Sequence, residues 1–342
     1  MNSRESPFWF EGIHLPFYGV TPRFWSMENK LIKMECMAFA PATVANVGPG
    51  YDVLGLALGG VGDRVRVRVD EGAPGVFLNE IVGDHGKLPR EAEQNTSSAA
   101  VSKVLGSRGL SESLRVVVDL YKGLPLGSGM GSSAASAVAA LVAVEGLFKD
   151  PLPLSEQLKI AGECEALACG AAHIDNVAPS LMGGMVLLPP NGALPISLPV
   201  PEDMWCGVVH PKMELRTEDS RSVLPESVTL EETTKAMGQL GMLISALYEG
   251  DVHRLALALE DHLVTPHRSP LIPGFREGMI GLSETEAIGG GISGSGPSVF
   301  VLGMGQDSCE KGMAAMNSAF HAAGLETDLW VSKIEPRGAF IL

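Results

Sequence analysis

The chain has 342 residues, of which 45% are hydrophobic and 19% charged, and its formal net charge is −15. This length predicts two domains, each able to bury a hydrophobic core of its own. The acidic balance argues against a nucleic-acid-binding or acidic-membrane surface, although a local cluster of backbone N–H groups can still hold phosphates. No apolar run reaches the roughly 18 residues of a membrane span, and the run 134–148 is interrupted by Glu145.

Five cysteines, an odd number with no C-x-x-C pair, predict buried thiols in a reducing compartment, so we expect a cytoplasmic protein. The first 26 residues contain Arg, Glu, Pro and aromatics but lack the apolar core of a secretory signal. We expect residues 1–33 to be an extension that is disordered or not translated, since Met27 and Met34 would also serve as starts.

From about residue 35 the hydrophobic pattern predicts regular elements. Alternation of valine with charge in 63–70 indicates a half-exposed strand, and apolar residues at helical spacing indicate a helix over 154–169. Glycine and proline place loops at 41–52 and 289–296. Further strands are expected at 36–40, 114–120, 183–190, 205–209, 298–302 and 328–334, and further helices at 94–105, 132–148, 229–248, 252–263 and 308–323.

The proline-rich segment 191–203 follows a predicted strand and is typical of a linker, which divides the chain into a domain at 34–200 and a second at 201–342. In the second part, the order strand–helix–helix–strand–helix–strand suggests a ferredoxin-like domain. The fold class is therefore expected to be α+β.

Residues 125–136 read PLGSGMGSSAAS. Glycine permits positive φ and a close approach of the backbone to a ligand, and the apolar run that follows predicts a buried helix. A helix N-terminus carries unpaired N–H donors and roughly half a positive charge, so loop and helix together predict a phosphate site. The Walker loop does not fit, because no Lys lies between Pro125 and Phe148, and the glycine spacing differs from the dinucleotide fingerprint. A glycine-rich turn before a core helix is the alternative.

This stretch resembles the phosphate loop of the GHMP kinases, P-x-x-x-G-L-G-S-S-A-A, with Met130 where Leu is usual. APATVANVGPGYDVLG (40–55) and GGGISGSGPSVF (289–300) match two further motifs of that family. The resemblance implies a two-domain fold in which a ribosomal-protein-like βα domain carries the phosphate loop and the ferredoxin-like domain follows. It also implies ATP binding by Asn95, Pro125, Leu126, Gly127, Ser128, Gly129, Met130, Gly131, Ser132, Ser133, Ala134 and Ala135.

Within the superfamily the sequence is most similar to the homoserine kinases. The similarity rests on HIDNVAPSLMGG (173–184), T-x-x-x-R-x-x-L-P (217–225) and R-x-x-L-I-P-G (268–274), with small departures at Pro49 and at Tyr51, where Phe is common. It implies transfer of the γ-phosphate of ATP to the hydroxyl of L-homoserine, giving O-phospho-L-homoserine and ADP for threonine biosynthesis.

A site for homoserine should offer a carboxylate for the ammonium, an arginine fork for the carboxylate and a polar group near the hydroxyl. The resemblance assigns the ammonium to Asp52, with Asn46 beside it, and the carboxylate to Arg221 and Arg268. Without the motif, the two arginines would be ordinary surface residues, and Asn46 and Asp52 would be loop caps.

Four further residues are expected near the reacting hydroxyl. Thr217 supplies a polar group, and His173 lies either near the substrate or in a structural role. Asp175 matches the position of the base in mevalonate-kinase relatives, whereas homoserine kinases are described as needing no strong base, with Asn176 close to the hydroxyl. Both mechanisms stay open.

The cofactors implied are ATP and Mg²⁺. The family pattern places Mg²⁺ between Ser133 and Glu165, since one hydroxyl and one carboxylate, completed by phosphate oxygens and water, are typical ligands. For Glu165 the alternative is a solvated helix face, and for Asn95 it is a helix cap.

Two other functions remain in view: a kinase for another small alcohol such as mevalonate, and a binding protein or sensor that has lost catalysis. The paired arginines with Asp52 argue against mevalonate, which has no amine, and the intact phosphate loop argues against a sensor. The expected partners are therefore L-homoserine and ATP, with no nucleic acid or membrane, in a possible homodimer.

Overall fold

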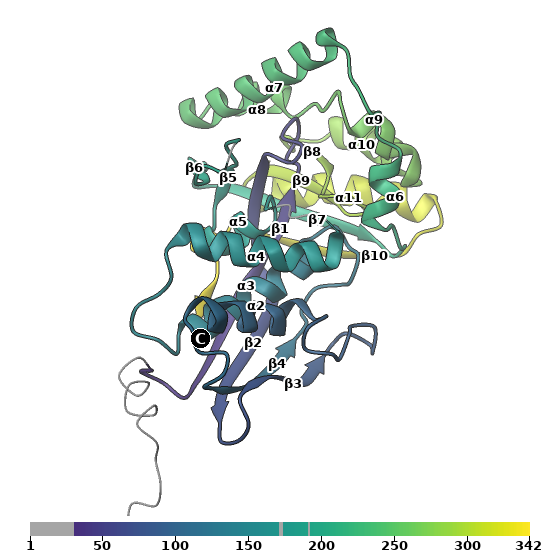
Figure 1. Cartoon of the computed structure of the whole chain (residues 1–342). Coiled ribbons are helices and arrows are strands. Elements are labelled where there is room, and N and C mark those ends of the chain that lie inside the picture. Colours follow the sequence, from purple (N-terminus) through teal and green to yellow (C-terminus); the bar gives the residue numbers. More distant parts are fainter. Residues whose placement is uncertain (1–30, 171–173, 191) are drawn as a thin grey trace, which may run out of the picture.

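The computed structural model describes residues 31–170, 174–190 and 192–342 and contains two β-sheets with helices packed on them (Figure 1). The first sheet has the strand order β11-β1-β2-β4-β3, with β5 paired to β2 and β6 paired to β5. Its strands are β1 (Glu35–Ala45), β2 (Leu54–Asp70), β3 (Gly75–Val82), β4 (Arg115–Tyr121), β5 (Met185–Leu187), β6 (Ile196–Leu198) and β11 (Phe340–Ile341).

The hairpin of β1 and β2 is longer than the pattern predicted. The strand expected at 36–40 continues to Ala45, so the predicted loop 41–52 shortens to 46–53. The strand expected at 63–70 begins at Leu54, although Gly62 lies within it. Glycine is required there, because a Cβ on Gly62 would lie 2.1 Å from the carbonyl oxygen of Ala40 on the neighbouring strand. The two strands therefore come too close for a side chain at that point.

Helices α2 (Thr96–Ser107), α3 (Ser132–Glu145), α4 (Leu154–Cys169) and α5 (Val177–Met182) pack together on the first sheet (Figure 1). α3 lies in the middle and is buried on nearly all sides, since its alanines and valines allow β1, β2, α2 and α4 to approach closely. The Asn95 side chain caps α2 by accepting from the N–H of Ser97 at 3.1 Å. The core of this part thus surrounds the helix that follows the glycine loop.

The second sheet has the strand order β10-β7-β9-β8, and all its pairs are antiparallel. When its four strands are numbered in chain order, they lie across the sheet in the order 4-1-3-2, which is the ferredoxin-like arrangement predicted from the order of elements. Residues 289–292, expected in a loop, form a strand instead, because they pair with 299–302. The strands are β7 (Met204–Pro211), β8 (Gly289–Ile292), β9 (Val299–Met304) and β10 (Thr327–Lys333).

Helices of the second part divide into two groups. α10 and α11 pack on each other and α11 on the second sheet, whereas α7 and α8 pack together at the periphery of the molecule (Figure 1). The described part of the chain contains no helix long and apolar enough to cross a membrane. The elements are α6 (Thr217–Ser222), α7 (Leu230–Glu249), α8 (Val252–Ala258), α9 (Thr265–Arg268), the 3₁₀ helix η1 (Ser269–Leu271), α10 (Phe275–Ser283) and α11 (Gln306–Ala322).

The boundary predicted near residue 200 stays a prediction. The chain passes from the first sheet to the second between β6 and β7, but it returns to the first sheet through β11, which pairs with β1. Of the extension expected at 1–33, residues 1–30 lie outside the described residues, and Leu31 forms a bridge with Phe148.

Candidate active site

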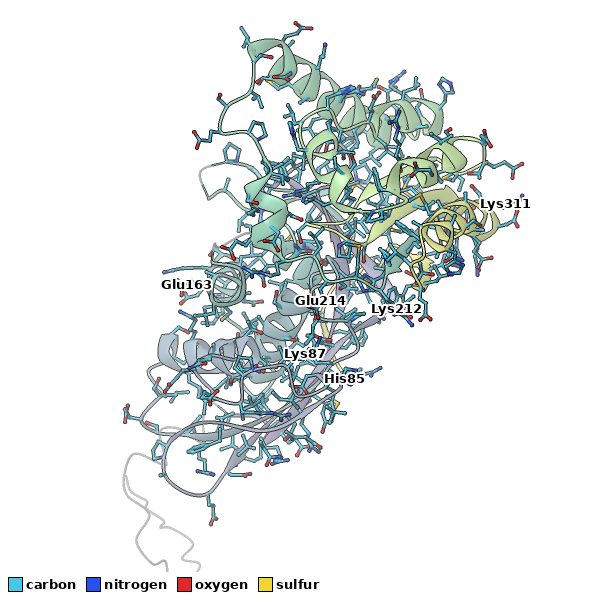
Figure 2. The ribbon with its side chains drawn as sticks, turned by 90° about the vertical axis from the view of Figure 1, so that its right-hand side faces the viewer. His85, Lys87, Glu163, Lys212, Glu214 and Lys311 are labelled. Atoms are coloured by element: carbon cyan, nitrogen blue, oxygen red, sulfur yellow. The ribbon has the colours of Figure 1, made fainter. Side chains whose placement is uncertain are left out.

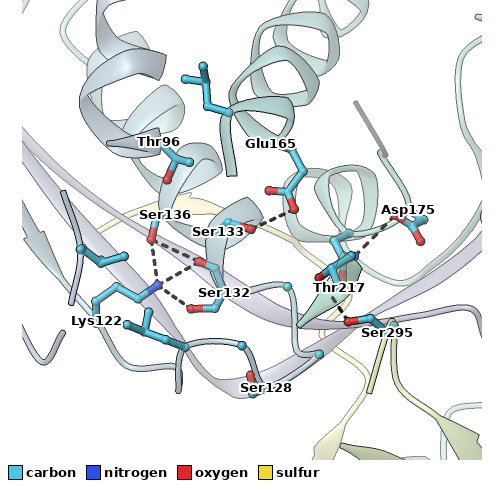
Figure 3. A pocket seen from close by; sticks show the side chains of 18 of the residues that line it. Thr96, Lys122, Ser128, Ser132, Ser133, Ser136, Glu165, Asp175, Thr217 and Ser295 are labelled. Atoms are coloured by element: carbon cyan, nitrogen blue, oxygen red, sulfur yellow. Dashed lines mark hydrogen bonds between the residues drawn. The ribbon is translucent and has the colours of Figure 1, made fainter. Parts of the chain in front are cut away.

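A cavity of about 470 Å³ lies between the glycine loop and the helices of the second part (Figure 3). It is lined by groups from α2, α3, α4, α6 and α9 and from the loop 293–298 between β8 and β9. The residues expected at the site that line it are Asn46, Asn95, Leu126, Gly127, Ser128, Gly129, Gly131, Ser132, Ser133, Glu165, Asp175, Asn176, Thr217, Arg221 and Arg268.

The glycine loop has the geometry that its sequence predicts. Gly127, Gly129 and Gly131 have φ values of 66°, 76° and 66°, and Gly131 is the N-cap of α3. A Cβ on Gly129 would lie 2.5 Å from the carbonyl oxygen of Ser293, whose hydroxyl donates to the Gly129 carbonyl at 2.7 Å. The first N–H groups of α3 have no partner within the helix, so they are donors directed at the cavity end of α3.

Lys122 is a site residue that the sequence analysis missed. Its side chain is 1% exposed, and its ammonium forms an ion pair with buried Asp63. It also donates to the hydroxyls of Ser132 and Ser136, at 2.7 and 2.9 Å (Figure 3). Lys122 precedes Pro125, the first residue of the phosphate-loop motif, so the motif does not include it.

The Ser133 hydroxyl donates to Oε1 of Glu165 at 2.9 Å (Figure 3). Glu165 is buried, whereas Glu163 on the same helix is exposed and pairs with Lys103 at 2.5 Å. Helix α4 therefore directs Glu165, and not Glu163, at the start of α3. A hydroxyl and a carboxylate oxygen in contact on the cavity wall are a donor set that fits Mg²⁺.

Asp175 and Asn176 lie next to each other on the cavity wall, at the start of α5. Asp175 is buried, and burial together with the negative charges of Asp52 and Glu165 raises its pKa to about 7. The Asn176 amide accepts from the Thr43 hydroxyl at 2.7 Å. A carboxyl whose pKa lies close to neutrality is suited to holding or releasing a proton.

Arg221 and Arg268 both lie near the ring of Tyr51, in the loop between β1 and β2. Arg268 is 1% exposed and donates to the carbonyl oxygens of Ser220 and Gly294. Arg221 donates to Oδ1 of Asp52 at 3.1 Å. The Asn46 amide also donates to the Gly294 carbonyl, at 2.8 Å, so Asn46 and Arg268 share this acceptor.

An ion pair joins the two parts of the chain near the cavity. The Lys87 ammonium and the Glu214 carboxylate lie 2.9 Å apart, both exposed (Figure 2). Leu88 and Pro89, which follow Lys87, line the cavity, and so does Thr217, which lies three residues after Glu214. The pair thus links the segments that carry these wall residues.

Comparison with known proteins gives two family matches: the GHMP kinases N terminal domain over residues 95–184 and the GHMP kinases C terminal model over residues 243–322. The chain is 42% identical to a homoserine kinase of Chlorobium phaeobacteroides over 314 residues, which cover 89% of this chain and 98% of that relative. The chain belongs to the homoserine kinase family.

Solved structures agree with this membership. The crystal structure of a homoserine kinase from Cytophaga hutchinsonii is 39% identical, with a TM-score of 0.87, and the match covers 91% of this chain and 98% of that one. Mevalonate kinase of L. major, at 15% identity and a TM-score of 0.68 over 90% of this chain and 99% of that one, shares the fold alone. This member of the homoserine kinase family is therefore a phosphotransferase with the two-domain α+β fold expected.

Several expected site residues of this homoserine kinase family member do not line the cavity. Met130, Ala134 and Ala135 belong to the hydrophobic core beneath the loop. Asp52 does not line the cavity but contacts Arg221, which does, and His173 is outside the described residues. Pro125 does not line the cavity either, although its carbonyl accepts from the Ser128 hydroxyl at 2.9 Å and so shapes the loop.

Proposed function

We propose that the cavity binds ATP and L-homoserine side by side and transfers the γ-phosphate to the homoserine hydroxyl. The observation that carries this proposal is that one cavity is lined both by the start of α3 with its glycine loop and by Arg221 and Arg268. The first group suits phosphates and the second suits a carboxylate. A kinase for a small alcohol that bears a carboxylate needs both.

The nucleotide would occupy the part of the cavity near α2 and the glycine loop. Leu88, Pro89 and Leu126 offer apolar surface for a base, with the Asn95 side chain nearby, although that amide already caps α2. The positive φ of the loop glycines and the free N–H groups at the start of α3 would hold the phosphates.

We propose that Ser133 and Glu165 hold Mg²⁺, because their oxygens already lie in contact on the cavity wall. When bound, the ion neutralises phosphate charge. The residues of the chain do the rest: the backbone of the loop orients the phosphates, and buried Lys122 fixes the first turn of α3 through Ser132.

L-Homoserine would bind with its carboxylate at Arg221 and Arg268. Asp52, which already pairs with Arg221, is the group proposed for the ammonium, and Asn46 holds the loop through its amide oxygen, which accepts from the Asp52 N–H at 2.8 Å. The ammonium of L-homoserine would thus face the Asp52 carboxylate, and its carboxylate would face the two arginines. Holding both charged groups fixes the direction in which the hydroxyl points.

The reaction forms a bond between the homoserine oxygen and the γ-phosphorus and breaks the bond to ADP, and the hydroxyl proton must leave. In a loose transition state, positioning and charge neutralisation supply most of the rate. Asn176 is proposed to hold the hydroxyl, with Thr217 near it, and its amide is itself held by Thr43. Asp175, whose pKa is raised to about 7, is the nearby group that can take the proton.

The test is ADP release by the chain begun at Met27, with Mg²⁺-ATP and L-homoserine, L-serine, mevalonate or galactose. We expect rapid turnover with L-homoserine alone, and a sharp rise in its KM in Arg268→Ala. Turnover of mevalonate would contradict the role given to both arginines. Tight ATP binding without turnover of any alcohol would contradict the kinase function and favour a sensor.

A further inference from the structure

Tyr51 lies in the loop between β1 and β2 and contacts both arginines of the proposed carboxylate site. Its hydroxyl oxygen accepts from Nη1 of Arg221 at 2.8 Å. The centre of its ring lies 5.8 Å from Cζ of Arg221 and 5.3 Å from Cζ of Arg268. One neutral side chain is thus in reach of two guanidinium groups.

The guanidinium groups of Arg221 and Arg268 carry the same charge and lie near each other, so a neutral contact that attracts both stabilises the pair. Arg268 is buried, its hydrogen bonds go to the backbone carbonyls of Ser220 and Gly294, and burial together with the charge of Arg221 lowers its pKa. An aromatic face attracts a cation without adding a charge that would compete for it. A second carboxylate in place of Tyr51, beside Asp52, would neutralise both arginines and repel the substrate carboxylate.

The hydroxyl of Tyr51 adds direction to this contact. Burial raises its pKa, and the neighbouring charge of Asp52 raises it further, so the phenol stays protonated at neutral pH. Arg221 is therefore fixed at two points: Nη1 at the Tyr51 oxygen and Nη2 at Asp52, 3.1 Å away. A guanidinium held at two donors presents its remaining N–H groups in one orientation.

We propose that Tyr51 is a specificity-determining positioning residue: it holds Arg221 and Arg268 as a preformed clamp and so makes the enzyme select alcohols that carry a carboxylate. This inference rests on the proposed function, because it takes the two arginines as the carboxylate site. It assigns to Tyr51 no contact with the reacting atoms.

Tyr51→Phe tests the hydroxyl and Tyr51→Leu tests the ring as well. Each variant is assayed with L-homoserine and with 3-aminopropan-1-ol, which has the same amine and hydroxyl but no carboxylate. Where turnover of the amino alcohol is too slow, its inhibition constant against L-homoserine replaces KM. Tyr248→Phe, on exposed α7, makes the same chemical change away from the cavity and is the control.

For Tyr51→Phe we expect the KM of L-homoserine to rise by about tenfold, the size associated with one hydrogen bond to a charged group, with kcat within about twofold of the parent. The KM of ATP and the constant for 3-aminopropan-1-ol should not change, and Tyr51→Leu should raise the KM of L-homoserine further. The preference of the enzyme for L-homoserine over 3-aminopropan-1-ol should therefore fall. A loss of folding would instead lower activity with both alcohols.

Two results would overturn the proposal: equal losses with both alcohols, which would mean a general structural role for Tyr51, or no change with either. Failure of the proposed function is distinguishable, because the unmodified enzyme would then not turn over L-homoserine at all. If it does turn over L-homoserine and Tyr51→Phe behaves like Tyr248→Phe, only the role of Tyr51 is wrong.

Discussion

Thr43 donates its hydroxyl hydrogen to Oδ1 of Asn176 at 2.7 Å, although the two residues are 133 positions apart. With its oxygen held in this way, the Asn176 amide points its NH₂ group away from Thr43, and that group lies 3.5 Å from Oδ1 of Asp175. Gly131 leaves room for this hydrogen bond, because a Cβ there would lie 2.0 Å from the Thr43 hydroxyl oxygen. The start of α3 and the start of α5 therefore meet at this hydrogen bond.

We expect Thr43→Val to lower kcat by about tenfold, because valine keeps the shape of the buried residue but leaves the Asn176 oxygen without its donor. The KM of ATP should change little. Thr43→Ser retains the hydroxyl and is the control in the same steady-state assay. Full kcat in Thr43→Val would show that the orientation of the Asn176 amide does not matter for the reaction.

Asn176→Ala and Asp175→Asn should both lose activity, with the larger loss in Asn176→Ala. The reason is that positioning of the hydroxyl contributes more than proton removal in a loose transition state. Single-turnover rates with bound L-homoserine measure the chemical step directly. A loss of several orders of magnitude in kcat for Asp175→Asn, with binding intact, would favour Asp175 as a true base.

Asp175 should also make the stability of the ligand-free protein depend on pH. The pKa of Asp175 is about 7 in the fold, against 3.8 for an unperturbed aspartate, so between these pH values the folded state binds the extra proton and the free energy of unfolding falls as pH rises. The decrease is at most roughly 4 kcal/mol and ends above the folded pKa. Urea titrations at pH 5 and pH 8 should show about 2–3 kcal/mol of this decrease, and Asp175→Asn should remove it. An unchanged pH dependence in that variant would place the titrating group elsewhere.

Lys122→Met should destabilise the fold by roughly 3–5 kcal/mol, because it leaves the carboxylate of Asp63 buried without its cation. Lys122→Met combined with Asp63→Asn should recover part of this loss. Lys87→Met is the matched control, since its pair with Glu214 is exposed to solvent and should contribute little to stability. Equal urea midpoints for the two lysine variants would contradict the structural role given to the buried pair.

Glu165→Gln should raise the Mg²⁺ concentration needed for half-maximal activity by at least about tenfold. Loss of a residue that only orients a metal ligand already costs a metal site roughly that much, and Glu165 is proposed as a ligand itself. Glu163→Gln lies on the same helix but faces Lys103, so it should behave as the parent. Activity measured against Mg²⁺ at fixed ATP gives both constants. The same Mg²⁺ dependence in both variants would mean that Glu165 is not a ligand.

The parts of the site that lie in one continuous stretch could be predicted from the sequence. The glycine loop, the start of α3 and the Asn95 cap depend on neighbouring residues, and the bounds of α4 were predicted to the residue. Thr43 and Lys122 could not be found, because their roles come from contacts with segments that the fold brings in from elsewhere.

Two missed elements have similar causes. β3 was not predicted because its alternation is broken between Leu78 and Glu80, where its pairing with β4 shifts register. α10 contains Gly278, which disfavours a helix, but a Cβ there would lie 2.6 Å from the sulfur of Met316 on α11. In both cases a tertiary contact outweighs the local preference.

The pairing of β11 with β1 affects how the molecule can be made. Ala38 and Phe39 of β1 face Ile341 and Phe340 across the sheet, and the Leu342 N–H donates to the Met37 carbonyl at 2.8 Å. During synthesis, β1 is made early, whereas Phe340 and Ile341 of β11 are made close to the end of the sequence. We therefore expect the β1 edge of the first sheet to lack its final partner until Phe340 and Ile341 have been synthesised, and an unpaired edge strand can pair with another chain.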